Sequence, residues 1–373
     1  MSSGLNLIVG AGFSGAVIAN LIADKLNETV LVIDKKDHIA GNCYDYRDDN
    51  GIMIHKYGSH IFHTNNEEVW KFVCKFGDFN QYMHKVYAVI DGIKTTIPFN
   101  FNTLYDVFPK TLAKRLEEKL LLNFKYNTKV PILEFQKQDD EDLKFLAEYI
   151  YEKVFLHYTT KQWGVSPECV DGAVTARVPV YLSNDSRYFQ DKYQGIPLEG
   201  YTKLAGNMLK HPNIEVRLNT DFKSMEKDNF KRIFYTGAID EFFDYEFGQL
   251  PYRSVNFKFE EYNRKFYQIN SVVNYPCNYD FTRIHEYKHY LSDKSDKTVI
   301  AKEYSEPFEL GKNERYYPIP KEENTILYNK YLNKAKTLKN VYFLGRLGDY
   351  KYYDMDKAIL RAMEVFEGVE NER

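Results

Sequence analysis

The hydrophobic pattern at the start of the chain predicts a strand, a helix and a second strand in close succession. Residues 5–9 (LNLIV) form an apolar run with the length of a short buried strand. In residues 16–26 the apolar side chains recur at helical spacing, at Val17, Ile18, Leu21, Ile22 and Leu26. A second apolar run, VLVI, leads into Asp34. This succession is typical of a βαβ unit, whose strands lie parallel in one sheet.

The turn between the first strand and the helix reads GAGFSG. A GxGxxG turn that follows a strand and opens a helix binds dinucleotides, although it does not by itself distinguish NAD from FAD. Gly10 permits the tight turn, Gly12 lets the backbone approach a pyrophosphate, and Gly15 lets helix and strand pack closely. The helix N-terminus offers N–H groups to phosphates, and Asp34 can accept hydrogen bonds from a ribose. The cofactor-binding residues that we expect here are Gly10, Gly12, Phe13, Ser14, Gly15, Asp34 and Lys35.

Patterns farther along the chain predict two further units. Residues 85–99 (KVYAVIDGIKTTIPF) form two alternating runs around Asp91-Gly92, a dipeptide that favours a hairpin turn. From Thr103 to about His157 the apolar residues have helical spacing. Period-two alternation returns between Tyr252 and Tyr304. We therefore expect a helical subdomain and an antiparallel sheet.

Three later runs are expected to return the chain to the first sheet. Residues 213–222, 232–237 and 340–345 read as strands, and the last is followed by a loop and an amphipathic helix. The sequence thus predicts a discontinuous dinucleotide-binding domain (1–82, 196–245 and 319–373), a helical subdomain (101–178) and an antiparallel sheet domain (83–100, 179–195 and 246–318).

Composition and charge exclude several classes of function. The 373 residues exceed the size of one hydrophobic core, and the net charge of −3 provides no basic field for nucleic acid. No apolar run approaches the length of a membrane span, and the first residues lack a signal-peptide pattern, so we expect a cytoplasmic protein without a membrane partner. The four cysteines lack CxxC spacing, which favours reduced thiols over disulfides or zinc.

Two loops are candidates for chemistry. Residues 56–64 (KYGSHIFHT) hold His60 and His63, but a metal site would need a third ligand, so we expect this loop to line the cofactor. Residues 164–180 contain proline, glycine and the single Arg177, and the part near 165–180 is a candidate lid.

A rival interpretation comes from His285-Glu286-Tyr287-Lys288-His289, which matches the HExxH pattern of zinc proteases. That chemistry needs a helix with both histidines on one face, and a third ligand. The surrounding sequence reads as strand and no distant ligand is evident, so we predict no metal.

Several motifs together resemble one family. They are GAGFSGAVIAN, GNCYDY, KYGSHIFHTN, YTTKQWG, QGIPLEGYTKL, YTGAIDEFFDYEFGQLPYRS, TRIHEYKH, RYYPIP and GRLGDYKYYDMD, and they extend from residue 10 to residue 356. This set is similar to the bacterial UDP-galactopyranose mutases, which are flavoproteins and commonly homodimers. The resemblance implies an α/β fold with an FAD-binding Rossmann-like domain, an inserted helical subdomain and an antiparallel sheet domain. It also implies an isomerase that interconverts UDP-galactopyranose and UDP-galactofuranose for cell-surface polysaccharides without net redox change. In that family the sugar's anomeric carbon forms an adduct with N5 of reduced FAD.

The resemblance also assigns site residues. Arg177 and Arg283 match the family's pyrophosphate-binding arginines, and with His63 they are the expected catalytic residues. Residues expected to contact the UDP-sugar are His84, Tyr158, Thr159, Trp163, Tyr188, Arg253, Asn274, Tyr317 and Tyr352. Further cofactor contacts are expected from Gly41, Asn42, His60, Ile61, Gly345, Arg346, Tyr353, Asp354 and Met355. Glu303 matches another family position near the site.

Departures from the family pattern leave alternatives open. His84 stands where several members have Asn, and residues 274–283 are one residue shorter than in some relatives. The sugar could therefore be N-acetylgalactosamine instead of galactose. An FAD oxidoreductase of the amine-oxidase-like fold is a second alternative, because that fold also begins with GxGxxG. A UDP-sugar sensor without turnover is the third.

Overall fold

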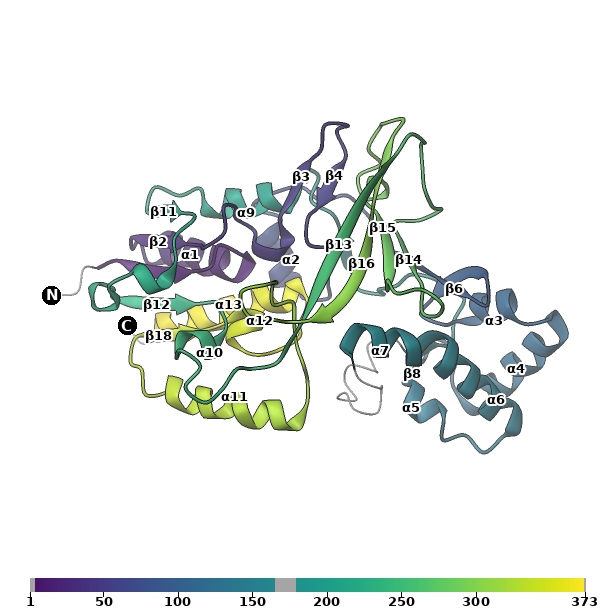
Figure 1. The fold of residues 1–373 in the computed structure, drawn as a ribbon. Helices are drawn as coiled ribbons and strands as arrows, with labels where there is room; N and C mark the ends of the chain where they lie inside the picture. Colours follow the sequence, from purple (N-terminus) through teal and green to yellow (C-terminus); the bar gives the residue numbers. More distant parts are fainter. Residues whose placement is uncertain (1–3, 165–178, 372–373) are drawn as a thin grey trace.

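The computed structural model describes residues 4–164 and 179–371, and its N-terminal unit is built on a parallel sheet (Figure 1). The five strands lie in the order β11-β2-β1-β12-β18, and every neighbouring pair is parallel. They are β1 (Asn6–Val9), β2 (Val30–Ile33), β11 (Ile214–Arg217), β12 (Arg232–Tyr235) and β18 (Val341–Phe343). The prediction that three later runs return to the first sheet is confirmed.

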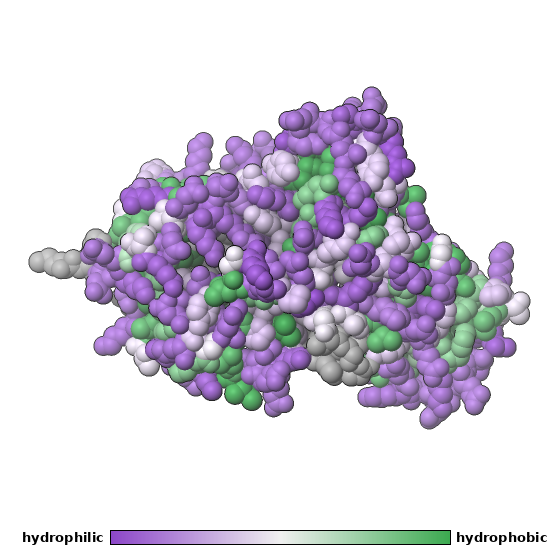
Figure 2. Space-filling model, in the orientation of Figure 1, coloured by the Kyte–Doolittle hydropathy of each residue, from purple (hydrophilic) through white to green (hydrophobic). Residues whose placement is uncertain are grey.

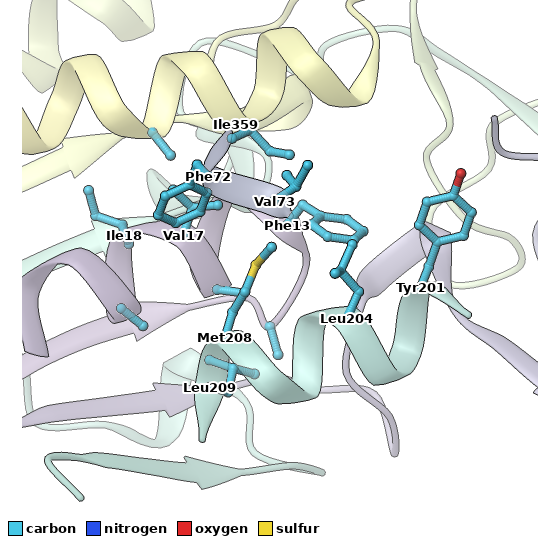
Figure 3. Packing of buried hydrophobic residues seen from close by; sticks show 14 of the residues in the cluster. Phe13, Val17, Ile18, Phe72, Val73, Tyr201, Leu204, Met208, Leu209 and Ile359 are labelled. Atoms are coloured by element: carbon cyan, nitrogen blue, oxygen red, sulfur yellow. The ribbon is translucent and has the colours of Figure 1, made fainter. Parts of the chain in front are cut away.

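Helices cover both faces of the parallel sheet. On one face, α1 (Phe13–Lys25) packs among α2 (Glu67–Val73), α9 (Tyr201–Leu209) and α13 (Met355–Asn371). Figure 3 shows side chains from all four helices in one cluster, including Phe13, Val17, Ile18, Phe72, Val73, Leu204, Met208 and Ile359. Because α1 is enclosed, the position of the glycine turn at its N-terminus is fixed by the core.

The opposite face of the parallel sheet is covered by short elements. Alternate strand residues such as Leu7, Leu31 and Ile33 pack there against Phe222 and Phe230. The covering elements are the 3-10 turns η4 (Phe222–Ser224) and η5 (Lys227–Asn229) and the helix α10 (Ile239–Phe242), against which α11 (Glu322–Ala335) packs. Helices on both faces explain why the strands read as continuous apolar runs.

A seven-stranded sheet lies between the parallel-sheet unit and the helical unit (Figure 1). Its order is β17-β13-β16-β15-β14-β6-β7. The strands are β6 (Val86–Ile90), β7 (Ile93–Ile97), β13 (Tyr252–Tyr262), β14 (Val272–Asn274), β15 (Arg283–Glu286), β16 (Thr298–Pro307) and β17 (Tyr317–Pro318). The hairpin β6–β7 is confirmed, with φ of 48° at Asp91 and 82° at Gly92, as a type I′ turn requires.

One pair in this sheet differs from the antiparallel arrangement that we predicted. Strands β14 and β6 run parallel. They belong to different hairpins, β14–β15 and β6–β7, and meet where these hairpins join edge to edge. No tight turn connects them, so nothing in the local sequence sets their relative direction.

The helical unit has its own core. It contains α3 (Phe101–Val107), α4 (Lys110–Asn123), α5 (Ile132–Phe135), α6 (Glu141–Ile150), the π-helical turn η2 (Tyr151–Leu156) and α7 (His157–Trp163). The short strands β8 (Lys129–Val130) and β9 (Val180–Tyr181) pair across it. Asp140 caps α6 by accepting hydrogen bonds from the N–H groups of Asp142 and Leu143. The predicted helical subdomain is present.

Short elements complete the chain: η1 (Gly41–Cys43), β3 (Asp45–Arg47), β4 (Met53–His55), β5 (Phe62–Thr64), β10 (Tyr193–Gly195), η6 (Tyr287–His289) and α12 (Gly345–Gly348). The face of the molecule in Figure 2 is mostly hydrophilic, with apolar residues in small groups. In residues 4–164 and 179–371, no helix is both long enough and apolar enough to cross a bilayer.

Candidate active site

Two adjoining cavities border the parallel-sheet unit, and the second of them also borders the antiparallel sheet and the helical unit. The first, the glycine-turn cavity, has a volume of about 660 Å³ and is lined by Gly10, Gly12, Phe13, Ser14 and their neighbours. The second, the central cavity, has a volume of about 510 Å³. The two share five lining residues: Asn42, His60, Arg346, Asp354 and Met355. One elongated ligand can therefore extend from the first cavity into the second.

The glycine turn fits a dinucleotide. A Cβ atom on Gly15 would lie 1.9 Å from the carbonyl oxygen of Gly10, so helix and turn are as close as the motif predicts. Gly10 has a φ of 105°, which only glycine adopts readily. The N-cap residue of α1 is Gly12, which has no side chain to occupy the helix N-terminus, and its N–H groups are left for phosphate.

Asp34 stabilises the same turn. Its Oδ2 accepts a hydrogen bond from the Ala11 N–H at 2.8 Å, and its Oδ1 accepts one from the Lys36 N–H at 2.9 Å. Asp34, Lys35 and Gly41 line the glycine-turn cavity, as does Gly345, where φ is 85°. The carboxylate thus holds the turn together and also lies at the edge of the cavity.

The junction of the two cavities carries an arginine and a neutral histidine. The Arg346 Nε donates to the Tyr353 carbonyl at 2.6 Å, and its guanidinium lies over the Tyr352 ring, 5.2 Å from the centroid. Burial lowers the pKa of His60 to about 3, so the ring is neutral. Its Nδ1 donates to the Gly58 carbonyl at 2.8 Å. The junction therefore places a guanidinium beside a neutral imidazole.

An aromatic wall closes one side of the central cavity. The rings of Trp163 and Tyr317 are 6.1 Å apart, those of Trp163 and Tyr352 are 6.0 Å apart, and those of Tyr317 and Tyr352 are 4.9 Å apart. Tyr158 and Thr159 lie one turn before Trp163 on α7, and both line the cavity. Flat faces with polar tips suit a nucleobase.

An ion pair lies in the middle of the central cavity. Glu303 faces Arg283 across the β15–β16 ladder and accepts from its Nε at 2.7 Å and its Nη2 at 2.9 Å. Burial would raise the pKa of Glu303, but the charge of Arg283 and a hydrogen bond from His285 outweigh it and lower that pKa to about 2. Burial alone would lower the pKa of Arg283, yet Glu303 raises it above its ordinary value. Both groups stay charged, and within residues 4–164 and 179–371 no hydrogen bond engages the Nη1 of Arg283.

The lining of the central cavity also contains His63, His84 and Tyr188. His63 stacks on Phe189 with ring centroids 3.6 Å apart, and its Nδ1 pairs with Asp191 at 3.0 Å. His84 lies 5.9 Å from the same Phe189 ring. Burial lowers the pKa of His84 to about 3, so it is neutral.

Polar atoms in the central cavity lack partners within the protein. The buried Nδ1 of His84, the Oδ1 of Asn274 and the Oε1 of Gln162 have no hydrogen-bond partner among residues 4–164 and 179–371. All three residues line the cavity. Since buried polar groups are normally paired, these atoms fit a polar ligand.

Some predicted site residues lie elsewhere. Arg253 is not among the residues that line either cavity: its Nε donates to the Gln162 carbonyl at 3.0 Å and its Nη2 to the Lys161 carbonyl at 3.2 Å. It therefore anchors the end of α7. Tyr353 donates its hydroxyl to Asp349 at 2.7 Å and is likewise absent from both linings. Arg177 and most of the predicted lid lie outside the described residues.

The interpretation of HExxH as strand is confirmed. His285 and Glu286 end strand β15, and a 3-10 turn follows where a zinc protease has a helix. Among the residues that the structure describes, no group of three His, Cys, Asp or Glu side chains could hold a metal ion.

Sequence reasoning missed several cavity residues, among them Phe189, Gln162 and His285. The sequence did contain an indication that His285 lies in the cavity. Alternate residues of a strand share a face, and His285 lies two positions after Arg283 in a predicted strand. Gln162 lies within the YTTKQW motif on the helical face of Thr159, so helical spacing also pointed to it. Phe189 follows Tyr188 in a loop, where no periodicity applies.

Comparisons with known proteins identify the family. A family model described as UDP-galactopyranose mutase matches residues 153–352, and one described as an NAD(P)-binding Rossmann-like domain matches residues 8–76. A probable UDP-galactopyranose mutase of Klebsiella pneumoniae is 39% identical over 363 residues, which cover 96% of this chain and 92% of the relative. The dTDP-fucopyranose mutase of Escherichia coli is also 39% identical, over 96% of both chains.

Solved structures agree on the fold. A reduced UDP-galactopyranose mutase matches with a TM-score of 0.72 at 15% identity, covering 100% of this chain and 95% of that one. A putrescine oxidase variant matches with a TM-score of 0.61 at 9% identity, covering 98% of both chains. The same fold thus occurs in a UDP-galactopyranose mutase and in a putrescine oxidase, whereas the relatives that are similar in sequence are mutases. The chain belongs to the UDP-galactopyranose mutase family.

Proposed function

We propose that the protein is a UDP-galactopyranose mutase that uses reduced FAD to interconvert UDP-galactopyranose and UDP-galactofuranose. The observation that carries the proposal is the pair of half-buried Arg283 and buried Glu303 beside an aromatic wall, in a cavity that adjoins the glycine-turn cavity. An amine oxidase would need no phosphate-binding arginine there. The product has the same oxidation state as the substrate, so the residues need only bind, orient and release.

The glycine-turn cavity has the residues to hold FAD. Gly12 and the N-terminus of α1 would bind its pyrophosphate, and Asp34 lies where a ribose hydroxyl can reach. The isoalloxazine would lie at the junction, beside His60, Arg346 and Met355. Bound there in its reduced form, FAD would supply an electron-rich ring as the nucleophile for the anomeric carbon.

The central cavity has the residues to hold the nucleotide sugar. The wall of Trp163, Tyr317 and Tyr352 offers an aromatic face for uracil. Arg283 presents its Nη1 to a phosphate oxygen and offsets the charge that builds up on UDP as it departs. Because Glu303 keeps this guanidinium oriented, the arginine is preorganised before the substrate enters.

The relative from Escherichia coli favours a second candidate. It is as similar to this chain as the relative from Klebsiella pneumoniae, and it is named for a dTDP-sugar without the hydroxyl at carbon 6. The protein could therefore act on dTDP-fucopyranose, a substrate that the same aromatic wall and arginine would accept. The N-acetylgalactosamine alternative, the lid around Arg177, the homodimer and the cytoplasmic location stay predictions.

The test is a side-by-side assay of the dithionite-reduced holoprotein. UDP-galactose, UDP-N-acetylgalactosamine and dTDP-fucose are supplied separately, and pyranose and furanose products are separated by chromatography. We expect furanose from UDP-galactose with reduced protein only. Furanose solely from dTDP-fucose would favour the second candidate. Bleaching of oxidised flavin by a substrate, with an oxidised product, would contradict both and indicate an oxidoreductase.

A further inference from the structure

A chain of hydrogen-bonded side chains connects Arg283 with the loop beside the cofactor junction. The Nε2 of His285 lies 2.7 Å from the Oε2 of Glu303, and its Nδ1 lies 2.5 Å from the Oγ of Ser59. The hydroxyl of Tyr290 in turn contacts the same Ser59 Oγ. His285 is 1% exposed and Glu303 is 2% exposed. The same Oε2 also accepts from the Nε of Arg283, so His285 and Arg283 share one carboxylate oxygen of Glu303.

The proton positions along the chain follow from elementary chemistry. Ionised Glu303 can only accept, so the Nε2 of His285 must carry the proton and donate. Burial lowers the pKa of His285 more than its contact with Glu303 raises it, so the ring is neutral. Its Nδ1 is then an acceptor, to which the Ser59 hydroxyl donates, while the Tyr290 hydroxyl donates to Ser59. Every hydrogen bond in the chain has a defined direction.

This series of hydrogen bonds runs from Arg283 to the loop 58–61, which lies beside the junction of the two cavities. Gly58, Ser59, His60 and Ile61 line the central cavity, and His60 also lines the glycine-turn cavity, where FAD would lie. Arg283 lies on the phosphate side and shares one face of β15 with His285. Both nitrogens of His285 are engaged by Glu303 and Ser59, so the ring has none left for substrate.

We propose that His285 is a positioning residue that fixes the loop 58–61 relative to Arg283, so that cofactor and pyrophosphate are held at one spacing around the anomeric carbon. This inference rests on the proposed function. Both contacts of the imidazole are required. The contact with Glu303 alone would leave the loop 58–61 unheld, and the contact with Ser59 alone would leave Arg283 unheld. Small errors in such spacing reduce turnover strongly even when binding is retained.

Two substitutions separate the two contacts. In His285→Gln the amide nitrogen can replace Nε2 and donate to Glu303, while the contact with Ser59 is lost. In His285→Asn the amide oxygen can replace Nδ1 and accept from Ser59, while the donor to Glu303 is lost. Reduced holoenzyme is assayed with UDP-galactose for kcat and KM, and UDP affinity is measured by titration calorimetry.

The two variants should fail differently. His285→Gln should lower kcat about 10- to 100-fold, the range for losing a supporting contact, and leave UDP affinity within about twofold. His285→Asn should also weaken UDP binding about tenfold, because Glu303 loses one of its two donors at Oε2 and orients Arg283 less firmly. Ser59→Ala should reproduce the kcat loss of His285→Gln, and the double variant should be no worse than either single one.

His289→Gln is the matched control, since His289 belongs to the same motif but lines neither cavity and pairs with Glu286. It should retain wild-type kinetics. Equal kcat and UDP affinity in wild type and both His285 variants would overturn the proposal, as would multiplicative losses in the Ser59–His285 double variant. If the His285 variants fail to fold, Ser59→Ala alone decides, and an unchanged kcat overturns the proposal. Failure of the proposed function differs, because the wild type itself would then yield no furanose.

Discussion

Lys161 of helix α7 donates a hydrogen bond to the carbonyl oxygen of Tyr275, at 2.5 Å. Its ammonium also donates to the carbonyls of Tyr279 at 2.9 Å and Phe281 at 3.2 Å. All three acceptors belong to the connection between Asn274 and Arg283. Lys161 therefore links helix α7, which carries Trp163 of the aromatic wall, to the segment that leads into Arg283.

Removing that ammonium should weaken substrate binding. Lys161→Met keeps the length and apolar stem of the side chain but leaves three carbonyls without their donor. We expect KM for the UDP-sugar to rise about tenfold and stability to fall by about 1–3 kcal/mol. Steady-state kinetics and thermal melts measure both. Lys144→Met, on the exposed side of α6, is the control and should change neither. A wild-type KM in Lys161→Met would contradict this role.

Arg283→Ala should abolish most turnover while FAD stays bound, because Arg283 lines the central cavity, where we propose that the substrate binds, and not the glycine-turn cavity. We expect kcat/KM to fall at least about 100-fold, the scale for removing a preorganised charge at a departing anion. Arg283→Lys keeps the charge but not the two-pronged pairing with Glu303, so it should recover only part of the activity. Visible flavin absorbance reports cofactor content. Near-normal rates in Arg283→Ala would remove this residue from the mechanism.

Gly15→Ala should prevent cofactor binding. The added methyl group would lie 1.9 Å from the Gly10 carbonyl oxygen, so the turn or the helix must move. We expect purified protein with little or no flavin absorbance. The control is Gly368→Ala on α13, where an added Cβ meets no atom within 4 Å. Full flavin content in Gly15→Ala would show that the turn does not hold the cofactor.

Buried neutral histidines should make stability fall in mild acid. Burial lowers the pKa of His55 and of His84 to about 3, from an ordinary value of 6.5. Below pH 6.5 these two histidines are protonated in the unfolded chain but stay neutral in the folded protein until the pH approaches 3. Because the unfolded state binds more protons, the free energy of unfolding decreases as pH falls from 6.5 towards 3. Each contributes a slope of about 1.4 kcal/mol per pH unit. Denaturant unfolding between pH 7 and pH 5 measures the slope.

His84→Asn tests the same point. Asparagine does not titrate, and the resemblance indicates that several family members have Asn at this position. Between pH 6 and pH 5, the free energy of unfolding of the variant should therefore fall less steeply with pH, by the contribution of one histidine, about 1.4 kcal/mol per pH unit. An unchanged slope would show that His84 does not contribute to the acid sensitivity.

The sequence predicted most of the parallel-sheet unit because its signals are local. The run from residue 5 to Asp34 contains strand, glycine turn, helix and strand in uninterrupted order, and the structure reproduces it. Helices α2 and α11 were missed although Asn66 caps α2 and acidic residues begin both. Their apolar faces are short, so periodicity alone gave little signal.

The site was predicted less completely because it depends on contacts between distant segments. The family resemblance named Arg253, but sequence could not tell that its guanidinium binds the end of α7 and not a ligand. The pairing of Arg283 with Glu303 follows from the register of β15 and β16, which are joined by a connection of 11 residues and not by a tight turn. Arg177 stays a prediction.

The π-helical turn η2 determines how helix α7 responds to a change in chain length. Its hydrogen bonds run from residue i to i+5, so it holds one residue more than an α-helical segment that covers about the same rotation. Deleting one residue within 151–156 would let the segment return to α-helical winding and would leave Trp163 on nearly the same face. Inserting one residue would rotate α7 by about 100° and move Trp163 out of the aromatic wall, while the helical core ahead of the insertion stayed intact. The stretch should therefore tolerate the loss of one residue better than a gain.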